Sequence, residues 1–191
     1  MALSVIQAEA INLADTFAFT GPVSFSGTTT GAGKDWTKTA QTTTSGAATF
    51  TISGIPSNVT EIIVIGNAVS RGTGTNQAGV RLGDSGGLES TGYTYNVVYT
   101  ANGNSLYQNS IQDRGYCEFG LYDSVYNFVC RCWNTSGNTW MMTMHSHTQA
   151  DGAYWTMVAC QKTLSGTLDR VGIADGNGTN FDGGTFQLWY K

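Results

Sequence analysis

Two histidines, His145 and His147, give the sharpest chemical signal in this chain of 191 residues. They are its only histidines, and one residue separates them within a segment that alternates like a β-strand. Successive strand side chains point to opposite faces, so both imidazoles share one face, about 7 Å apart. Imidazoles bind transition metals, and three copies meeting on an axis would bring six of them around one ion. The alternative is a pair of surface or interface histidines.

The strand predicted around these histidines, Thr139–Thr148, has two different faces. The alternation puts Met141 and Thr143 on the histidine face. The opposite face is apolar and carries Trp140, Met142 and Met144. We therefore expect the histidines to point away from the core.

Tyr93 and Tyr95 form a second candidate site. They are same-face neighbours in a predicted strand and follow the glycine-rich loop 83–87. A tyrosine offers an apolar ring with a polar hydroxyl, which suits contacts with proteins or sugars. The pair is thus a possible ligand or interface platform, and the alternative is that both rings belong to a sandwich core or a subunit contact.

Enzymatic chemistry finds little support in the residues. Loop 83–87 resembles the nucleophile loop of some serine proteases, but no histidine lies in a separate, suitable loop. Most carboxylates fall at turns, where they usually cap backbone amides rather than pair for glycoside hydrolysis. Segment 175–182 has oxygen ligands at alternating positions, but it lacks the Glu that closes a calcium loop, so a long hairpin loop capped by Asx turns is expected there. We predict a non-enzymatic protein with no catalytic residue and no cofactor.

The four cysteines are predicted to be small buried side chains within strands. Cys130 and Cys132 lack the two-residue gap of common zinc knuckles. A reducing compartment makes disulfides unfavourable. The full set is Cys117, Cys130, Cys132 and Cys160.

Composition and pattern predict an all-β fold. Charged residues are only 12%, and 25 glycines accompany 2 prolines, which favours strands joined by many tight turns. Short alternating segments with turn signals between them follow one another from Ala47 onward, as in an antiparallel β-sandwich or jelly roll. The strongest strand signal is 59–68, whose aliphatic run Ile62–Ile65 predicts a strand that is buried on both faces.

Residues 1–46 differ from the sandwich domain predicted for residues 47–191. Apolar residues at odd positions alternate with small or polar ones, but they are too few for a core of their own. This extended N-terminal segment therefore reads as an arm for attachment or oligomerisation. Its expected docking residues are Phe17, Phe19, Val23 and Phe25.

Charge and hydropathy exclude several partners. The net charge is −4 and no cluster of Lys and Arg occurs, so we expect neither nucleic acid nor an anionic membrane as partner. The N-terminus lacks the basic and apolar regions of a signal peptide, and no stretch approaches the ~20 apolar residues of a membrane span. We expect folding in a cytoplasm.

Three blocks of sequence carry a resemblance to a known family. The first block is 50–64, the second is 81–93, and the third combines 168–173 with 180–190. They resemble a β-sandwich domain of virion proteins of tailed phages, often tail fibres. The segment 11–21 is similar to segments that precede such domains. The chain departs from a long fibre in being short, without shaft repeats or a large tail-anchoring domain.

The resemblance implies a structural protein of the virion, assembled in the host cytoplasm, and it supplies no catalytic residues. Together with the predicted two-sided burial of Ile62–Ile65, it favours a homotrimer. It also gives a precedent for metal at His145 and His147, because His-x-His strands bind metal in the trimeric tips of some phage fibres. Two functions stay open. One is a short fibre or spike that docks by its arm and binds host glycan. The other is a capsid decoration (cement) protein that stabilises the head shell.

Overall fold

The structure is a computed structural model, and it describes residues 35–72, 77–101, 105–120, 124–148 and 155–191. Every regular element in these residues is a β-strand, and all strand pairs are antiparallel. No helix in this part of the chain is long and apolar enough to cross a membrane.

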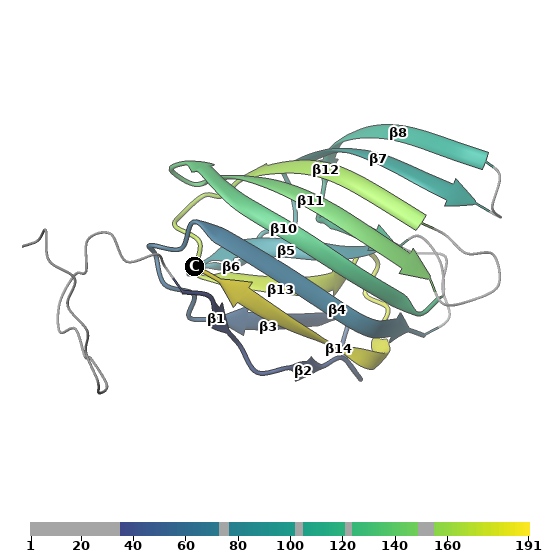
Figure 1. The fold of residues 1–191 in the computed structure, drawn as a ribbon, viewed down its shortest axis with the longest axis horizontal. Helices are drawn as coiled ribbons and strands as arrows, with labels where there is room; N and C mark the ends of the chain where they lie inside the picture. Colours follow the sequence, from purple (N-terminus) through teal and green to yellow (C-terminus); the bar gives the residue numbers. More distant parts are fainter. Residues whose placement is uncertain (1–34, 73–76, 102–104, 121–123, 149–154) are drawn as a thin grey trace, which may run out of the picture. The chain divides into compact units, whose positions relative to one another are not determined.

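The larger sheet contains nine strands, and its central strands lie side by side in Figure 1. Its order is β1-β14-β4-β10-β11-β12-β7-β8, with β2 also paired to β14. The bounds are β1 Thr37–Lys38, β2 Thr42–Thr43, β4 Glu61–Arg71, β7 Tyr93–Ala101, β8 Ser105–Arg114, β10 Tyr126–Ser136, β11 Thr139–Thr148, β12 Trp155–Thr163 and β14 Phe181–Tyr190.

The smaller sheet contains five strands in the order β3-β13-β5-β6, with β9 also paired to β5. Their bounds are β3 Thr49–Ser53, β5 Ala78–Asp84, β6 Gly87–Leu88, β9 Cys117–Gly120 and β13 Arg170–Asp175. The two sheets stack around one apolar core. The predicted all-β antiparallel sandwich is therefore confirmed.

Alternation along the strands determines which side chains enter this core. In β12 every second residue is buried, and β11 follows the same rule. Trp140, Met142 and Met144 are buried as the sequence predicted, and Met141 and both histidines point outward. The aliphatic run of β4 is covered on one face within the described residues.

Ile62 and Val64 are fully buried, but Ile63 and Ile65 are only half-buried. Burial of this run is therefore complete on one face only, and cover of the other face by residues 1–34 or by a sister subunit stays a prediction. A two-layer sandwich covers one face of each sheet, so the other face of β4 is left partly open to solvent.

Residues 35–46 belong to the larger sheet. The predicted arm spanned residues 1–46, yet β1 and β2 pair with β14, and the backbone N–H of Thr39 donates to the carbonyl of Leu188 at 2.9 Å. Thr44 is completely buried, and its hydroxyl donates to the carbonyl of Gly183 at 2.5 Å. The docking residues Phe17, Phe19, Val23 and Phe25 lie outside the described residues, so their role stays a prediction.

A buried ion pair joins the two sheets. Arg71 ends β4 in the larger sheet, Asp175 ends β13 in the smaller one, and their side-chain atoms Nη1 and Oδ2 lie 2.6 Å apart. The other carboxylate oxygen of Asp175 accepts the backbone N–H groups of Asn177 and Thr179, at 2.9 and 3.0 Å. The predicted Asx turn is thus present. The loop that it caps crosses from one sheet to the other instead of closing a hairpin.

Replacing one partner of this pair should destabilise the fold strongly. Arg71→Met leaves the buried Asp175 carboxylate without its guanidinium, so we expect the free energy of unfolding to fall by about 3–5 kcal/mol. Denaturation in guanidinium chloride measures this loss. The matched control is Arg131→Met on β10, where the arginine is exposed and a change within about 0.5 kcal/mol is expected. Equal losses in the two variants would show that the buried pair is not important for stability.

Candidate functional site

The face of the larger sheet that points away from the smaller sheet, called the outer face here, carries unusual apolar exposure. Among the described residues, four large apolar side chains are exposed by about two-fifths: Val129 (40%), Met141 (41%), Trp155 (43%) and Met157 (39%). All four come from β10, β11 and β12, which are adjacent strands. Neighbouring exposed apolar side chains of this kind mark interaction surfaces more often than single ones do.

Strand register arranges this face in rows. Asn127 pairs with His147, and His147 pairs with Trp155, so these three residues form one row across three strands. The next row runs from Ile65 through Val129 and His145 to Met157. An amide, two imidazoles and an indole thus lie side by side, although they are far apart in the sequence.

These rows line a hollow of about 340 Å³, called the outer hollow here. Its side walls and floor come from β4, β10, β11 and the first residue of β12. The lining residues are Ile65, Gly66, Asn67, Asn127, Phe128, Val129, His145, Ser146, His147 and Trp155.

A β-bulge in β4 shapes one wall of the outer hollow. The register between β4 and β10 shifts beside Asn67 and Ala68, and Ala68 has a φ of +50°, which is rare for a residue other than glycine. The amide oxygen of Asn127 accepts the backbone N–H of Ala68 at 2.9 Å, and its Nδ2 lies 3.4 Å from Nε2 of His147. Asn127 therefore links the strained bulge to the row of polar side chains.

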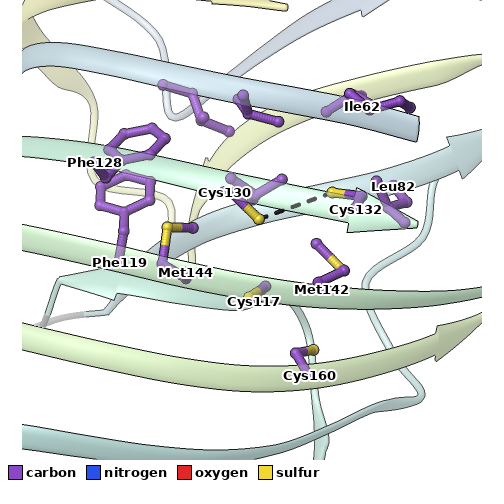
Figure 2. Close-up of a cluster of buried hydrophobic side chains, with 14 of the residues drawn as sticks. Ile62, Leu82, Cys117, Phe119, Phe128, Cys130, Cys132, Met142, Met144 and Cys160 are labelled. Carbon is purple, nitrogen blue, oxygen red and sulfur yellow. Dashed lines mark hydrogen bonds between the residues drawn. The ribbon is translucent and has the colours of Figure 1, made fainter. Parts of the chain in front are cut away.

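Gly66 allows the strands to pack closely behind this wall. A Cβ atom at position 66 would lie 2.0 Å from the ring of Phe128, so no larger residue fits. The Phe128 ring in turn stacks on Phe119, with centroids 4.2 Å apart (Figure 2). The outer hollow thus rests on a rigid aromatic layer.

The chemistry of the outer hollow suits binding. Trp155 offers an exposed apolar ring at one side, and Asn127 and the two histidines offer polar atoms beside it. The hydroxyl of Ser146 is buried and donates to the carbonyl of Phe119 at 2.6 Å, so it is held away from solvent. None of the described residues that line the outer hollow is a carboxylate.

The structure places His145 and His147 together on the outer face, both exposed. In the described part of the chain, no group of three or more His, Cys, Asp or Glu side chains is arranged to hold a metal ion. A metal at this pair would need ligands from further copies of the chain, so the metal site remains a prediction.

The predicted platform of Tyr93 and Tyr95 was wrong. Both rings are buried, with at most 3% exposed, because β7 turns this face toward the smaller sheet. The hydroxyl of Tyr93 accepts the backbone N–H of Leu82 at 2.7 Å, and that of Tyr95 donates to Glu118 at 2.7 Å. These tyrosines are structural. Among the described residues, Trp155 is the aromatic side chain exposed on the outer face, and sequence reasoning did not single it out. The signal for it was the position of Trp155 and Met157 on one face of β12, opposite Val158 and Cys160.

A charged cluster lies where β6 meets the segment after β12. The hydroxyl oxygen of Ser165 lies 2.8 Å from a carboxylate oxygen of Asp84 and 2.8 Å from one of Glu89, and its single proton can be donated to either. The backbone N–H of Ser165 donates to Glu89 at 2.7 Å, and Glu89 forms an ion pair with the largely buried Lys162. Desolvation opposes ionisation of Glu89, but hydrogen bonds from Lys162 and Ser165 outweigh it and lower the pKa of that carboxyl. The hydrogen bond from Ser165 also lowers the pKa of Asp84. Two ionised carboxylates leave no general acid here, so the cluster suits structural bracing.

The four cysteines meet in the core, as predicted, and none forms a disulfide (Figure 2). They come from β9, β10 and β12, and the Sγ atoms of Cys130 and Cys132 lie 3.8 Å apart. Burial, reinforced by hydrogen bonds from neighbouring thiols, raises the pKa of Cys130 well above its usual range. This thiol is therefore held in its unreactive, protonated form.

No protein-family model, curated protein or solved structure matches this chain. The interpretation of the outer hollow therefore depends on its geometry and chemistry.

The buried thiols should be protected in the folded protein. We expect all four to react slowly with Ellman's reagent under native conditions, and all four to react at once in guanidinium chloride, because access requires unfolding. Absorbance of the released thiolate gives the number of reactive thiols under native conditions and in guanidinium chloride. Rapid reaction of even one thiol in the native protein would contradict the burial described here.

Proposed function

We propose that this chain is a non-enzymatic structural protein of a tailed-phage virion. In this proposal it is a short fibre or spike component that docks by residues of its N-terminal segment and presents the sandwich to a glycan of the host surface. The resemblance of blocks 50–64, 81–93, and 168–173 with 180–190 supports the virion role. The observation that carries the binding role is the outer hollow, with Trp155 exposed beside Asn127 and the two histidines.

A saccharide fits this combination of groups. The apolar face of a sugar ring can lie on the indole of Trp155, and its hydroxyls can exchange hydrogen bonds with the amide of Asn127 and the imidazoles. Among the described residues that line the hollow, the polar groups are amides, imidazoles and a hydroxyl, which suit binding of a saccharide. The bulge at Ala68 and the stacked Phe119 and Phe128 hold the groups in place before the ligand arrives.

Self-association is part of the proposal. The exposed apolar side chains Val129, Met141 and Met157, with the half-buried Ile63 and Ile65, offer surface that a sister subunit can cover. A homotrimer would place such surfaces at subunit contacts and repeat the outer hollow, which strengthens weak binding to a glycan-coated cell through avidity.

The same apolar surface favours a second candidate function. A capsid decoration protein needs broad contact with shell proteins, and exposed Met and Val side chains on a flat sheet face suit such contact. In this alternative the outer face lies against other virion proteins, and Trp155 anchors a protein instead of a sugar.

Truncation of Trp155 tests the glycan role. We expect the purified protein to bind at least one bacterial surface polysaccharide on an array, and Trp155→Ala to weaken that binding by about tenfold or more, because the stacking surface is lost. Gln161→Ala is the matched control, since Gln161 is exposed on the same strand and face but does not line the outer hollow. Unchanged binding by Trp155→Ala, or no binding to any polysaccharide, would speak against the fibre proposal.

Position on the particle separates the two functions. If the protein is a fibre or spike component, gold-labelled antibodies should mark a few sets of copies at the tail of purified virions. Label spread over the head in hundreds of copies would instead support the decoration role. Absence of label from purified virions would contradict both.

A further inference from the structure

The central strands of the outer face are almost free of carboxylates. Figure 1 shows these strands, β4, β10, β11 and β12, side by side in the larger sheet. β10, β11 and β12 contain no Asp or Glu, and the one carboxylate of β4 is Glu61. Glu61 is neutralised by Lys191, whose Nζ lies 3.0 Å from its Oε2. The chain as a whole has a net charge of −4, so its negative charge comes from other segments.

Arg131 is an exposed cation in the middle of these strands. Register places it on β10 between Ile63 of β4 and Thr143 of β11, and neither neighbour is charged. No carboxylate among the described residues forms an ion pair with its guanidinium. Other cations of the chain do have a carboxylate partner: Arg71, Lys162, Arg170 and Lys191. The positive charge of Arg131 is thus available to a molecule outside the fold.

This cation borders the outer hollow. Val129, which lines the hollow, precedes Arg131 by two residues on the same strand, so the two side chains share one face about 7 Å apart. His145 lies directly across from Val129 on β11. A ligand that fills the outer hollow and extends by one row along β10 therefore meets the guanidinium.

The charges and donors of this region favour an anion. A guanidinium binds the oxygens of a carboxylate or a phosphate through two parallel N–H bonds, which is the strongest geometry available to a side-chain donor. The imidazoles of His145 and His147 add further N–H donors beside it. Because no carboxylate is among the described lining residues, an arriving anion meets no like charge there.

We propose that the glycan bound at the outer hollow is acidic, and that Arg131 pairs with one of its carboxylate or phosphate groups. This inference rests on the proposed glycan role and names the class of saccharide. One ring lies on the indole of Trp155, and the anionic group of another ring reaches Arg131. Trp155 and Arg131 are two strands and four residues apart in register, which is about 10 Å across the sheet and about 13 Å along it. The ligand is therefore an oligosaccharide and not a single sugar.

Removal of the charge from the ligand tests this proposal first. On an array of bacterial surface polysaccharides, we expect the full-length protein to retain those that carry carboxylates or phosphates and to pass over neutral ones. The best-bound polysaccharide is then compared with its carboxyl-reduced form and with its phosphatase-treated form. One of the two treatments should weaken binding by about tenfold or more, and which one does so identifies the source of the anion.

Removal of the charge from the protein completes the test. Arg131→Gln should weaken binding of the same polysaccharide by about tenfold or more, and Arg131→Lys should weaken it less, because lysine keeps the charge without the bidentate geometry. Arg170→Gln is the matched control, since it removes the same charge from the smaller sheet. Equal melting temperatures of the variants verify that all of them fold. Raising the salt concentration from about 50 to about 300 mM should weaken binding by the unmodified protein more than binding by Arg131→Gln.

The outcomes distinguish this inference from the proposed function. Binding confined to neutral polysaccharides, and lost in Trp155→Ala, would overturn the acidic ligand while the glycan role stands. Failure to bind any polysaccharide would contradict the glycan role itself. Undiminished binding by Arg131→Gln would overturn the inference, and so would equally tight binding to a DNA oligonucleotide, because the site would then select charge alone.

Discussion

One-sided cover of the larger sheet is the constraint on which the rest of the structure depends. Five strands stack on nine, so the inner face of the larger sheet is buried and its outer face is not. Alternation then divides every strand of that sheet between the two faces. The inner positions hold the cysteines, methionines and aromatic rings of the core. The outer positions hold Val129, Met141, Trp155, Met157 and the two histidines, which become available for contact with something outside the fold.

The candidate sites arise where the regular sheet is interrupted. The bulge in β4 bends the strand beside Asn127, and this break in register opens the outer hollow between strands that would otherwise lie flush. A second hollow, of about 130 Å³ and lined by residues that include Asn134 and Leu168, lies where strands give way to loops, and backbone hydrogen bonds join those loops. Each site therefore combines a rigid frame with polar side chains, as recognition requires. The charged cluster around Lys162 and the ion pair of Arg71 brace the fold elsewhere.

The two sites differ in what they can recognise. The outer hollow is wide, aromatic and bordered by exposed apolar side chains, so it can serve a glycan chain or another protein. The second hollow is small, and none of the described residues that line it is charged. The two sites can be examined independently, because no residue lines both.

The sequence by itself determined the features that depend on local pattern. Alternation predicted the all-β sandwich, the outward direction of His145 and His147 and the buried side of β11, because side-chain direction in a strand follows from neighbouring residues alone. Turn chemistry likewise predicted the Asx turn at Asp175. Only the tertiary structure decided which face of each strand is covered, and so the sequence left open whether Tyr93 and Tyr95 form a ligand platform or belong to the core. It also brought Asn127, His147 and Trp155 into one row, because register between strands depends on contacts across the whole sheet and not on any single segment.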